Sequence, residues 1–156
     1  MPKIDRKLIA KKADIVSDLK KIIKNENILS HEDETRPFET DALTAYKQKP
    51  LLVVFPENTN EVSKILSYCN QHRIKVVPRG AGTGLSGGAL PMADSILLCL
   101  GKFNKIIDID YRNRCVVAQP GVTNLSITEA VQDRGFYYAP DPSSQIACSI
   151  GGNVAE

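Results

Sequence analysis

The sequence lacks the features that mark several large classes of protein. Its 156 residues include no tryptophan, and its longest apolar runs, Leu51–Phe55 and Ile96–Leu100, have the length of strands. A membrane span would need ~18 apolar residues. The proportions of 42% apolar and 24% charged residues exclude a disordered chain and a disulfide scaffold. A net charge of +2 is too small to indicate a nucleic-acid partner.

Patterns typical of metal sites and nucleophilic catalysis are also missing. The four cysteines are Cys69, Cys99, Cys115 and Cys148. Their separations of 30, 16 and 33 residues match no zinc or iron–sulfur spacing, so we expect reduced thiols in a cytosolic protein. The two histidines, His31 and His72, stand too far apart in sequence to indicate a catalytic dyad. We predict no metal site and assign no catalytic residue.

Positive charge is concentrated at the start of the chain. Residues 1–24 carry eight Lys or Arg against three Asp, while residues 25–156 carry twelve against fifteen acidic residues. Apolar residues recur mostly at spacings of three, four and seven between Ile4 and Ile23, which predicts an amphipathic helix. Its basic face has two interpretations, a solvated surface or weak docking to an anionic surface.

The rest of the pattern predicts an α+β fold of two small lobes. A surface connection, 25–49, leads to a β-α-β unit, and three strands joined as a meander come next. A second helix and a loop-like tail complete the pattern. The expected strands are 28–29, 51–55, 75–77, 96–100, 105–109 and 115–119, and the expected helices are 60–71, capped by Asn58 or Thr59, and 124–134, capped by Thr123 and ended by Gly135. We divide the chain into 1–49, a helix with its connecting segment, and 50–156, the main domain.

The most informative segment is the glycine-rich stretch 76–91, which holds five of the ten glycines. Glycine permits a positive φ and lets a ligand approach the main chain. Successive backbone N–H groups can then form a concave nest that suits a diphosphate. Thr83 and Ser86 add hydroxyl groups to the same turn.

Three other interpretations of this loop are less favoured by the sequence. Gly82–Gly87 spells Gly-x-Gly-x-x-Gly, but a Rossmann turn must open a helix and the run that follows here is strand-like. A Walker A loop requires Lys-Ser/Thr after its last glycine, where this sequence has Gly88-Ala89. A turn without a ligand is disfavoured, because so many glycines cost conformational entropy.

A second cluster of glycine, proline and serine lies between residues 138 and 156. Pro140 and Pro142 fix φ, serines offer hydroxyl groups, and Gly151-Gly152 opens the backbone again. Taken together with the first loop, this cluster indicates the other wall of an extended nucleotide site.

Together these motifs resemble the FAD-binding domain of the vanillyl-alcohol oxidase/PCMH flavoprotein family, most of all its glycolate oxidase and D-lactate dehydrogenase members. The resemblance runs from about Arg36 onward and is carried by several motifs in order. They are 36–41 (RPFETD), 50–56 (PLLVVFP), 77–88 (VPRGAGTGLSGG), 119–122 (QPGV), 140–144 (PDPSS) and 150–155 (IGGNVA).

The resemblance implies that FAD lies between two α+β subdomains, the second of them truncated, with the glycine loop at the pyrophosphate. Thr83 stands where some relatives carry a flavin-linking His, so non-covalent FAD is implied. The implied cofactor-binding residues are Arg79, Gly80, Ala81, Gly82, Thr83, Gly84 and Leu85 in the loop, Pro140, Ser143 and Ser144 along the flavin, and Ser149, Ile150, Gly151, Gly152, Asn153 and Ala155 in the second cradle. Arg79 is equally compatible with a surface position at a strand end.

The implied parent protein is an FAD-dependent dehydrogenase or oxidase that converts a 2-hydroxy acid, of the glycolate or D-lactate type, to the 2-oxo acid. The resemblance implies an absent substrate domain, an iron–sulfur partner subunit, no transmembrane segment and a cytoplasmic location, with peripheral attachment at the inner face of the membrane as an option. We expect the fragment alone to be inactive and to bind FAD weakly or not at all. The alternatives are a non-catalytic module that binds a phosphate-bearing nucleotide through Gly80–Gly88, and a cell-wall precursor reductase of related fold.

Overall fold

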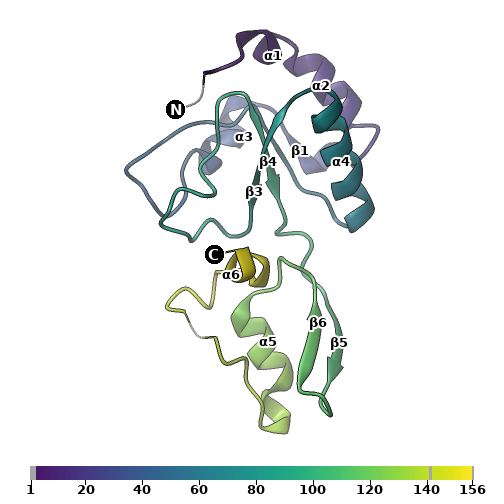
Figure 1. The fold of residues 1–156 in the computed structure, drawn as a ribbon, viewed down its shortest axis with the longest axis vertical. Coiled ribbons are helices and arrows are strands. Elements are labelled where there is room, and N and C mark those ends of the chain that lie inside the picture. The colour runs from purple at the N-terminus through teal and green to yellow at the C-terminus, as the bar shows by residue number, and fades with distance from the viewer. Residues whose placement is uncertain (1–2, 141, 156) are drawn as a thin grey trace.

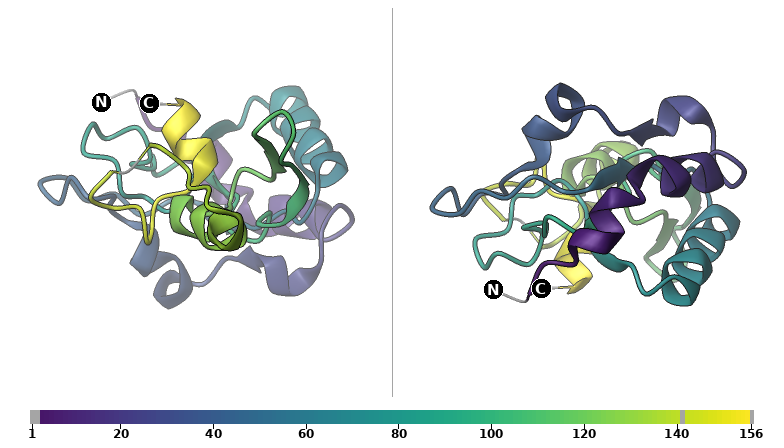
Figure 2. Two further views of the ribbon diagram at one scale, coloured as in Figure 1. Left: turned by 90° about the horizontal axis from the view of Figure 1, so that it is seen from below. Right: turned by 90° about the horizontal axis from the view of Figure 1, so that it is seen from above.

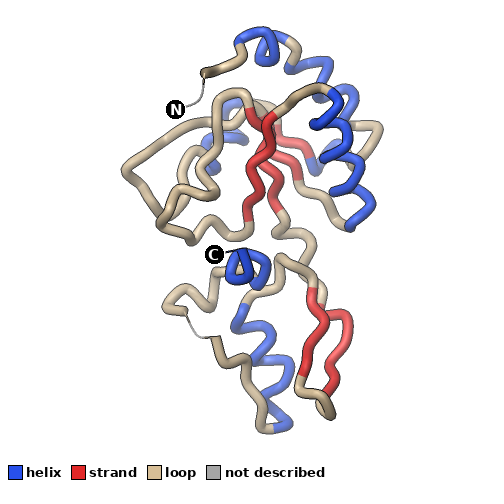
Figure 3. Tube along the Cα trace, in the orientation of Figure 1, coloured by secondary structure: helices blue, strands red, loops and turns tan. Residues whose placement is uncertain are grey.

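The computed structural model of the chain describes residues 3–140 and 142–155. Two groups of elements follow one another along the chain (Figures 1 and 3). The first comprises α1 (Arg6–Ala10), α2 (Lys12–Leu19), β1 (Ile28–Leu29), α3 (Glu32–Thr35), β2 (Leu52–Val54), α4 (Thr59–Gln71), β3 (Lys75–Arg79) and β4 (Ser95–Cys99). The second comprises β5 (Ile106–Asp110), β6 (Cys115–Ala118), α5 (Asn124–Val131) and α6 (Ile150–Ala155). Short 3-10 turns cover Asn25–Asn27, Arg36–Phe38 and Gln132–Arg134.

The first group is built around a four-stranded sheet with the order β1-β2-β4-β3. Strands β2, β4 and β3 run parallel, and β1 joins the edge of β2 antiparallel. Helix α4 connects β2 to β3, and its N-terminus is capped by Asn58, whose side chain accepts a hydrogen bond from Glu61 N. The predicted β-α-β unit and the cap are therefore correct, although β3 runs two residues beyond the expected end.

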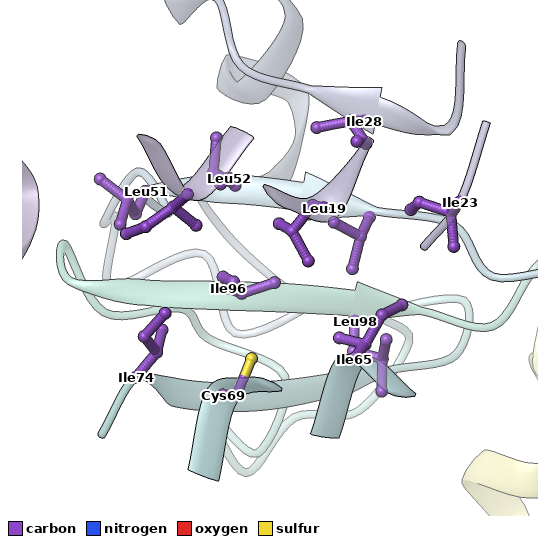
Figure 4. Packing of buried hydrophobic residues seen from close by; sticks show 12 residues of the cluster. Leu19, Ile23, Ile28, Leu51, Leu52, Ile65, Cys69, Ile74, Ile96 and Leu98 are labelled. Atoms are coloured by element: carbon purple, nitrogen blue, oxygen red, sulfur yellow. The ribbon is translucent and has the colours of Figure 1, made fainter. Parts of the chain in front are cut away.

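The sheet buries both faces because β2 is apolar throughout and β4 is apolar from Ile96 to Cys99. On one face, Leu52 and Ile96 pack with Leu19 of α2 and Ile65 of α4 (Figure 4). On the other face lie Val53, Val77, Leu97 and Cys99, against partly buried Leu29, Phe38, Phe55 and Met92. Alternate residues of each strand thus belong to different clusters, as the two-residue period requires.

The N-terminal helix expected between Ile4 and Ile23 is present but interrupted. Asp5 caps α1 by accepting hydrogen bonds from the N–H groups of Lys7 and Leu8, and a turn at Lys11 separates α1 from α2. The apolar stripe reaches the core through Ile15, Leu19 and Ile23, each no more than 4% exposed. Residues before and after position 49 therefore share one hydrophobic core. The division of the chain into 1–49 and 50–156 stays a prediction.

A buried carboxylate ties the chain start to the sheet. Asp94 accepts hydrogen bonds from Asp5 N at 2.8 Å and from Lys75 Nζ at 2.7 Å. Burial opposes ionisation of this carboxyl, but the hydrogen bonds from Lys75 and from Asp5 outweigh it and lower the pKa of Asp94 below its ordinary value.

The expected meander of three strands is wrong. Residues 96–99 belong to β4, which inserts between β2 and β3 in parallel register, and β5 and β6 form an antiparallel hairpin. Parallel neighbours need a long connection, and the glycine-rich segment 80–94 supplies it. Local patterns show where a strand lies but not which sheet it joins.

The tail after Tyr138 is not wholly loop-like either. Residues Ile150–Ala155 form α6, although Gly151 and Gly152 have low helix propensity. Tertiary contacts account for the helix: Ile150 N donates to Val122 O and Gly151 N to Pro120 O, each at 2.8 Å. The predicted α5, its Thr123 cap and the left-handed Gly135 that ends the following turn are confirmed.

The molecule is elongated, with the sheet and its helices at one end and the hairpin and α5 at the other (Figure 1). Helix α6 lies between them, close to the strand ends from which the glycine-rich loop departs, and the two end-on views agree with this arrangement (Figure 2). Among the described residues, no helix has the length and hydrophobicity to cross a bilayer.

Candidate functional site

The glycine-rich loop between β3 and β4 carries a run of unused main-chain donors. Within the described residues, none of the backbone N–H groups of Ala81–Ser86 donates a hydrogen bond to a protein acceptor. The loop contains no helix, so the Gly82–Gly87 pattern is not a Rossmann turn, as expected. Gly82 and Gly87 adopt φ values of +74° and +76°, which glycine tolerates best. The loop thus offers neutral donors suited to an anionic ligand.

The two glycine clusters meet at Gly80. A Cβ on Gly80 would collide with Ser149 Oγ and would lie 4.0 Å from the backbone N of Gly152. The close approach of the chains therefore requires a residue without a side chain at this position. The contact brings the loop and the tail together, and their role as two walls of one site stays a prediction.

Ser149 carries an unpaired buried polar atom at the junction. The residue is 5% exposed, and its Oγ has no hydrogen-bond partner among the described residues. Its backbone pairs with Thr123, the cap of α5, in an isolated antiparallel bridge. A buried hydroxyl without a partner costs free energy, so a ligand group at this place would stabilise the site.

The Arg79 side chain is not free at the surface, because its guanidinium group is engaged in contacts within the protein. Its Nη1 donates to Thr40 O at 2.7 Å, and its guanidinium lies 5.8 Å from the centre of the Phe38 ring. A Cβ on Gly82 would lie 2.6 Å from Arg79 Cζ, so the side chain fills the space beneath the loop.

A segment that sequence reasoning did not assign to the site crosses this loop. We call Glu39–Leu43 the strap. Ala42 N donates to Gly82 O at 2.9 Å, and Leu43 Cδ2 lies 3.8 Å from the place of a Cβ on Gly87. Asp41, 5% exposed, accepts from Leu43 N through Oδ1, while its Oδ2 has no partner among the described residues. The motif at 36–41 was the only sequence signal for this segment.

The other predicted residues of the tail divide into two groups. Pro140, Ser143 and Ser144 lie in the loop before α6, where Asn124 Nδ2 holds Pro140 O at 3.2 Å. In α6, Asn153 bonds to the same Asn124 through its side chain. No hydrogen bond joins Pro140, Ser143 or Ser144 to the first glycine loop in the described residues, so their role along a flavin stays a prediction.

Several main-chain donors of the second cradle are already used. Ile150 N, Gly151 N and Asn153 N donate to the carbonyls of Val122, Pro120 and Ser149. A Cβ on Gly151 would lie 2.7 Å from Pro120 Cβ, so this glycine is needed for packing. Gly152 and Ala155 are exposed and stay candidates for ligand contact. Three of the main-chain donors in residues 149–155 thus have protein acceptors, and the role of this segment at a cofactor stays a prediction.

The described residues contain no cluster of three or more side chains suited to a metal ion. All four cysteines are free, and only Cys115 is exposed. Burial raises the pKa of Cys99 to about 12 and that of Cys69 to about 11, so neither is a thiolate near neutral pH. The described residues of the site thus offer main-chain hydrogen-bond donors, which suit ligand binding.

Comparisons with known proteins agree with this geometry. Residues 50–156 match the family described as "FAD binding domain". The whole chain is 48% identical to the glycolate oxidase subunit GlcD of Escherichia coli strain K12 over 156 residues, which is 30% of that protein. It is also 35% identical to the D-lactate dehydrogenase of Anaerostipes hadrus over 136 residues, covering 86% of this chain and 28% of the relative.

Among solved structures, p-cresol methylhydroxylase with substrate bound matches 85% of this chain and 26% of its own length, with a TM-score of 0.71 and 23% identity. At this identity the match establishes the fold, and the predicted PCMH-type α+β architecture is confirmed. The chain spans less than a third of the length of these relatives.

Proposed function

Because the chain belongs to the family of FAD-binding domains, we propose that it is the FAD-binding portion of an enzyme that oxidises a 2-hydroxy acid to the 2-oxo acid. The names of the two curated relatives, a glycolate oxidase subunit and a D-lactate dehydrogenase, support this substrate class. The comparisons give no support to the non-catalytic nucleotide module. The names of these two relatives favour the 2-hydroxy-acid enzyme over a cell-wall precursor reductase.

The residues of the site fit the cofactor. The observation that carries the proposal is the run of unpaired N–H groups from Ala81 to Ser86, placed where Gly80 meets Ser149 and Gly152. Neutral donors can solvate the two charges of a diphosphate without a buried counter-ion. When bound, FAD supplies the redox chemistry, and the chain binds and orients it.

In this proposal the loop from Gly80 to Leu85 holds the diphosphate, and Ser149 Oγ donates to a ligand acceptor at the junction. Thr83 occupies the loop position at which a histidine would be needed for a covalent flavin link, so the cofactor is dissociable.

A direct test measures the changes in amide chemical shift that a flavin causes in this chain, by nuclear magnetic resonance. FAD should shift the amide signals of residues 80–86 and 149–152, whereas FMN, which lacks the diphosphate bridge, should shift them far less. We expect a Kd above about 1 µM, equivalent to a binding free energy weaker than about −8.2 kcal/mol. Equal shifts with both flavins, or no shift at millimolar FAD, would contradict the proposal.

The oxidation itself is tested in a chimera. This chain replaces the matching segment of the Escherichia coli glycolate oxidase subunit, of which it covers 30%. The chimera should retain bound FAD and glycolate-dependent reduction of an artificial electron acceptor, while the 156-residue chain alone should show no turnover. A chimera that binds FAD but oxidises neither glycolate nor D-lactate would contradict the proposal that this chain serves as the FAD-binding portion of such an enzyme.

The finer proposals concern partners and location. We infer a cytoplasmic protein that works with an iron–sulfur subunit, on the ground of its resemblance to the glycolate oxidase type. Peripheral attachment at the inner membrane face is supported by exposed Lys3, Arg6, Lys7 and Lys11, beside Ile4, which is 50% exposed. Co-purification with a neighbouring iron–sulfur protein and sedimentation with anionic vesicles test the two proposals separately.

A further inference from the structure

The shape of the glycine loop depends on contacts from outside it. Beneath the loop, the Arg79 guanidinium is fixed by Thr40 O at 2.7 Å and lies against the Phe38 ring. A second, weaker contact joins Nη1 to Ala89 O at 3.5 Å, near the far end of the loop. One side chain therefore spans the loop and connects it to the preceding segment.

The strap holds the loop from the other side. Ala42 N donates to Gly82 O, so the residue with positive φ is fixed through both its carbonyl and the guanidinium beneath it. The strap itself is closed by Gln48 N, which donates to Glu39 O at 2.7 Å, and by the Asx turn of Asp41 onto Leu43 N. These contacts are all internal to the protein and require no ligand.

We infer that the strap and the Arg79 side chain form a clasp that sets the glycine loop in its binding shape before the ligand arrives. This inference rests on the proposed function, and it makes Arg79 a positioning residue rather than a phosphate ligand. It also extends the cofactor site to residues 39–43, which lie outside the matched domain of residues 50–156. A loop ordered beforehand binds more tightly, because its conformational entropy is not lost on binding.

The decisive measurement is made without ligand. Backbone order parameters of residues 81–88 should be near the rigid value of about 0.85 in the wild-type chain and fall below about 0.6 in Arg79→Met and Arg79→Lys. Exchange of the Ala42 amide, the donor to Gly82 O, should become at least tenfold faster in both. Arg112→Met, at an exposed arginine of the β5–β6 turn, is the matched control and should change neither.

FAD titration then separates the two roles. A clasp predicts an approximately tenfold loss of affinity in both Arg79 variants, with the salt dependence of the wild type, since the lysine keeps the charge but not the planar donor geometry. A rigid loop in the variants, or affinity retained by Arg79→Lys and lost by Arg79→Met in a salt-dependent manner, would overturn the clasp.

Leu43→Ala provides an independent variant if the Arg79 variants do not fold. It removes the strap contact at Gly87 without altering any charge, so mobility should increase around Gly87. Unchanged order parameters there would contradict the clasp. Failure of FAD to bind any variant or the wild type, with the ligand-free differences intact, would instead contradict the proposed function and leave the clasp standing.

Discussion

The two ends of the molecule differ in how completely they bury their strands. Every residue of β2 and β4 is buried, whereas Ile107 in β5 is 64% exposed and Val117 in β6 is 53% exposed. The sheet is covered on both faces by helices and loops, while no residue of β5 or β6 is fully buried. The glycine loop follows β3 of the buried sheet, and Ser149 belongs to the end of the molecule that contains the hairpin. The candidate site therefore joins a loop that follows a buried strand to a tail from the end whose strands are less buried.

The largest expected effect tests this contrast directly. Leu97→Ala removes a fully buried side chain from the middle of β4 and should lower the free energy of unfolding by about 3–5 kcal/mol. Val117→Ala, on the exposed face of the hairpin, should change it by less than about 0.5 kcal/mol. Urea unfolding of both variants measures the difference. Similar losses would mean that the two ends are equally buried in solution.

The contrast between the ends was only partly predictable from the sequence. Helix α4, its Asn58 cap and the strands around it follow from local patterns, since period and capping are local properties. The insertion of β4 between β2 and β3 was missed, because strand order depends on contacts between distant segments.

The candidate site was predictable to a similar extent. The glycine loop can be recognised from its composition. The strap acts through the backbone carbonyl of Thr40 and the backbone N–H of Ala42, and such backbone groups leave no signal in the sequence. Helix α6 was missed because packing against Pro120 overrides the low propensity of Gly151 and Gly152.

The next largest effect is expected at Asp94, whose carboxylate anchors the start of the chain to the sheet. Because the pKa of Asp94 is lowered in the folded protein, its stabilisation is complete above the ordinary carboxyl value of 3.8 and is lost as the pH falls through the lower folded value. Asp94→Ala should cost about 2–3 kcal/mol at pH 7, because it leaves Lys75 and the Asp5 N–H without their acceptor.

The control for Asp94 is Asp108→Ala in the exposed part of β5. The difference in stability between wild type and Asp94→Ala should shrink below pH 4, whereas Asp108→Ala should track the wild type throughout. A difference that is independent of pH down to 2 would show that the carboxylate charge is not what anchors residue 5.

A smaller effect is expected at two glycines with open space around them. Gly135 has φ +75° and Gly101 has no positive φ, and a Cβ meets nothing within 4 Å at either position. Gly135→Ala should therefore destabilise by about 1 kcal/mol through backbone strain alone. Gly101→Ala should be neutral or slightly stabilising. Equal changes in Tm would indicate that the turn after α5 can change its backbone conformation to accommodate an alanine. The hairpin end would then be more flexible than the positive φ of Gly135 implies.

The smallest expected change in stability lies where the two ends meet. Ser149→Ala removes a buried hydroxyl that has no partner in the described residues, so the free energy of unfolding should stay within about 0.5 kcal/mol of the wild type or rise slightly. The same substitution should weaken FAD binding by about 1 kcal/mol, the value of one hydrogen bond, or roughly fivefold in Kd. Ser67→Ala, at an exposed serine of α4 that lies outside the candidate site, is the matched control. The unequal response of stability and affinity is what makes the experiment informative: a hydroxyl that serves the fold would lower stability on removal, whereas one reserved for a ligand lowers affinity alone. A loss of stability above about 1 kcal/mol with FAD affinity intact would assign Ser149 to the packing of the tail against Gly80 and take it out of the cofactor site.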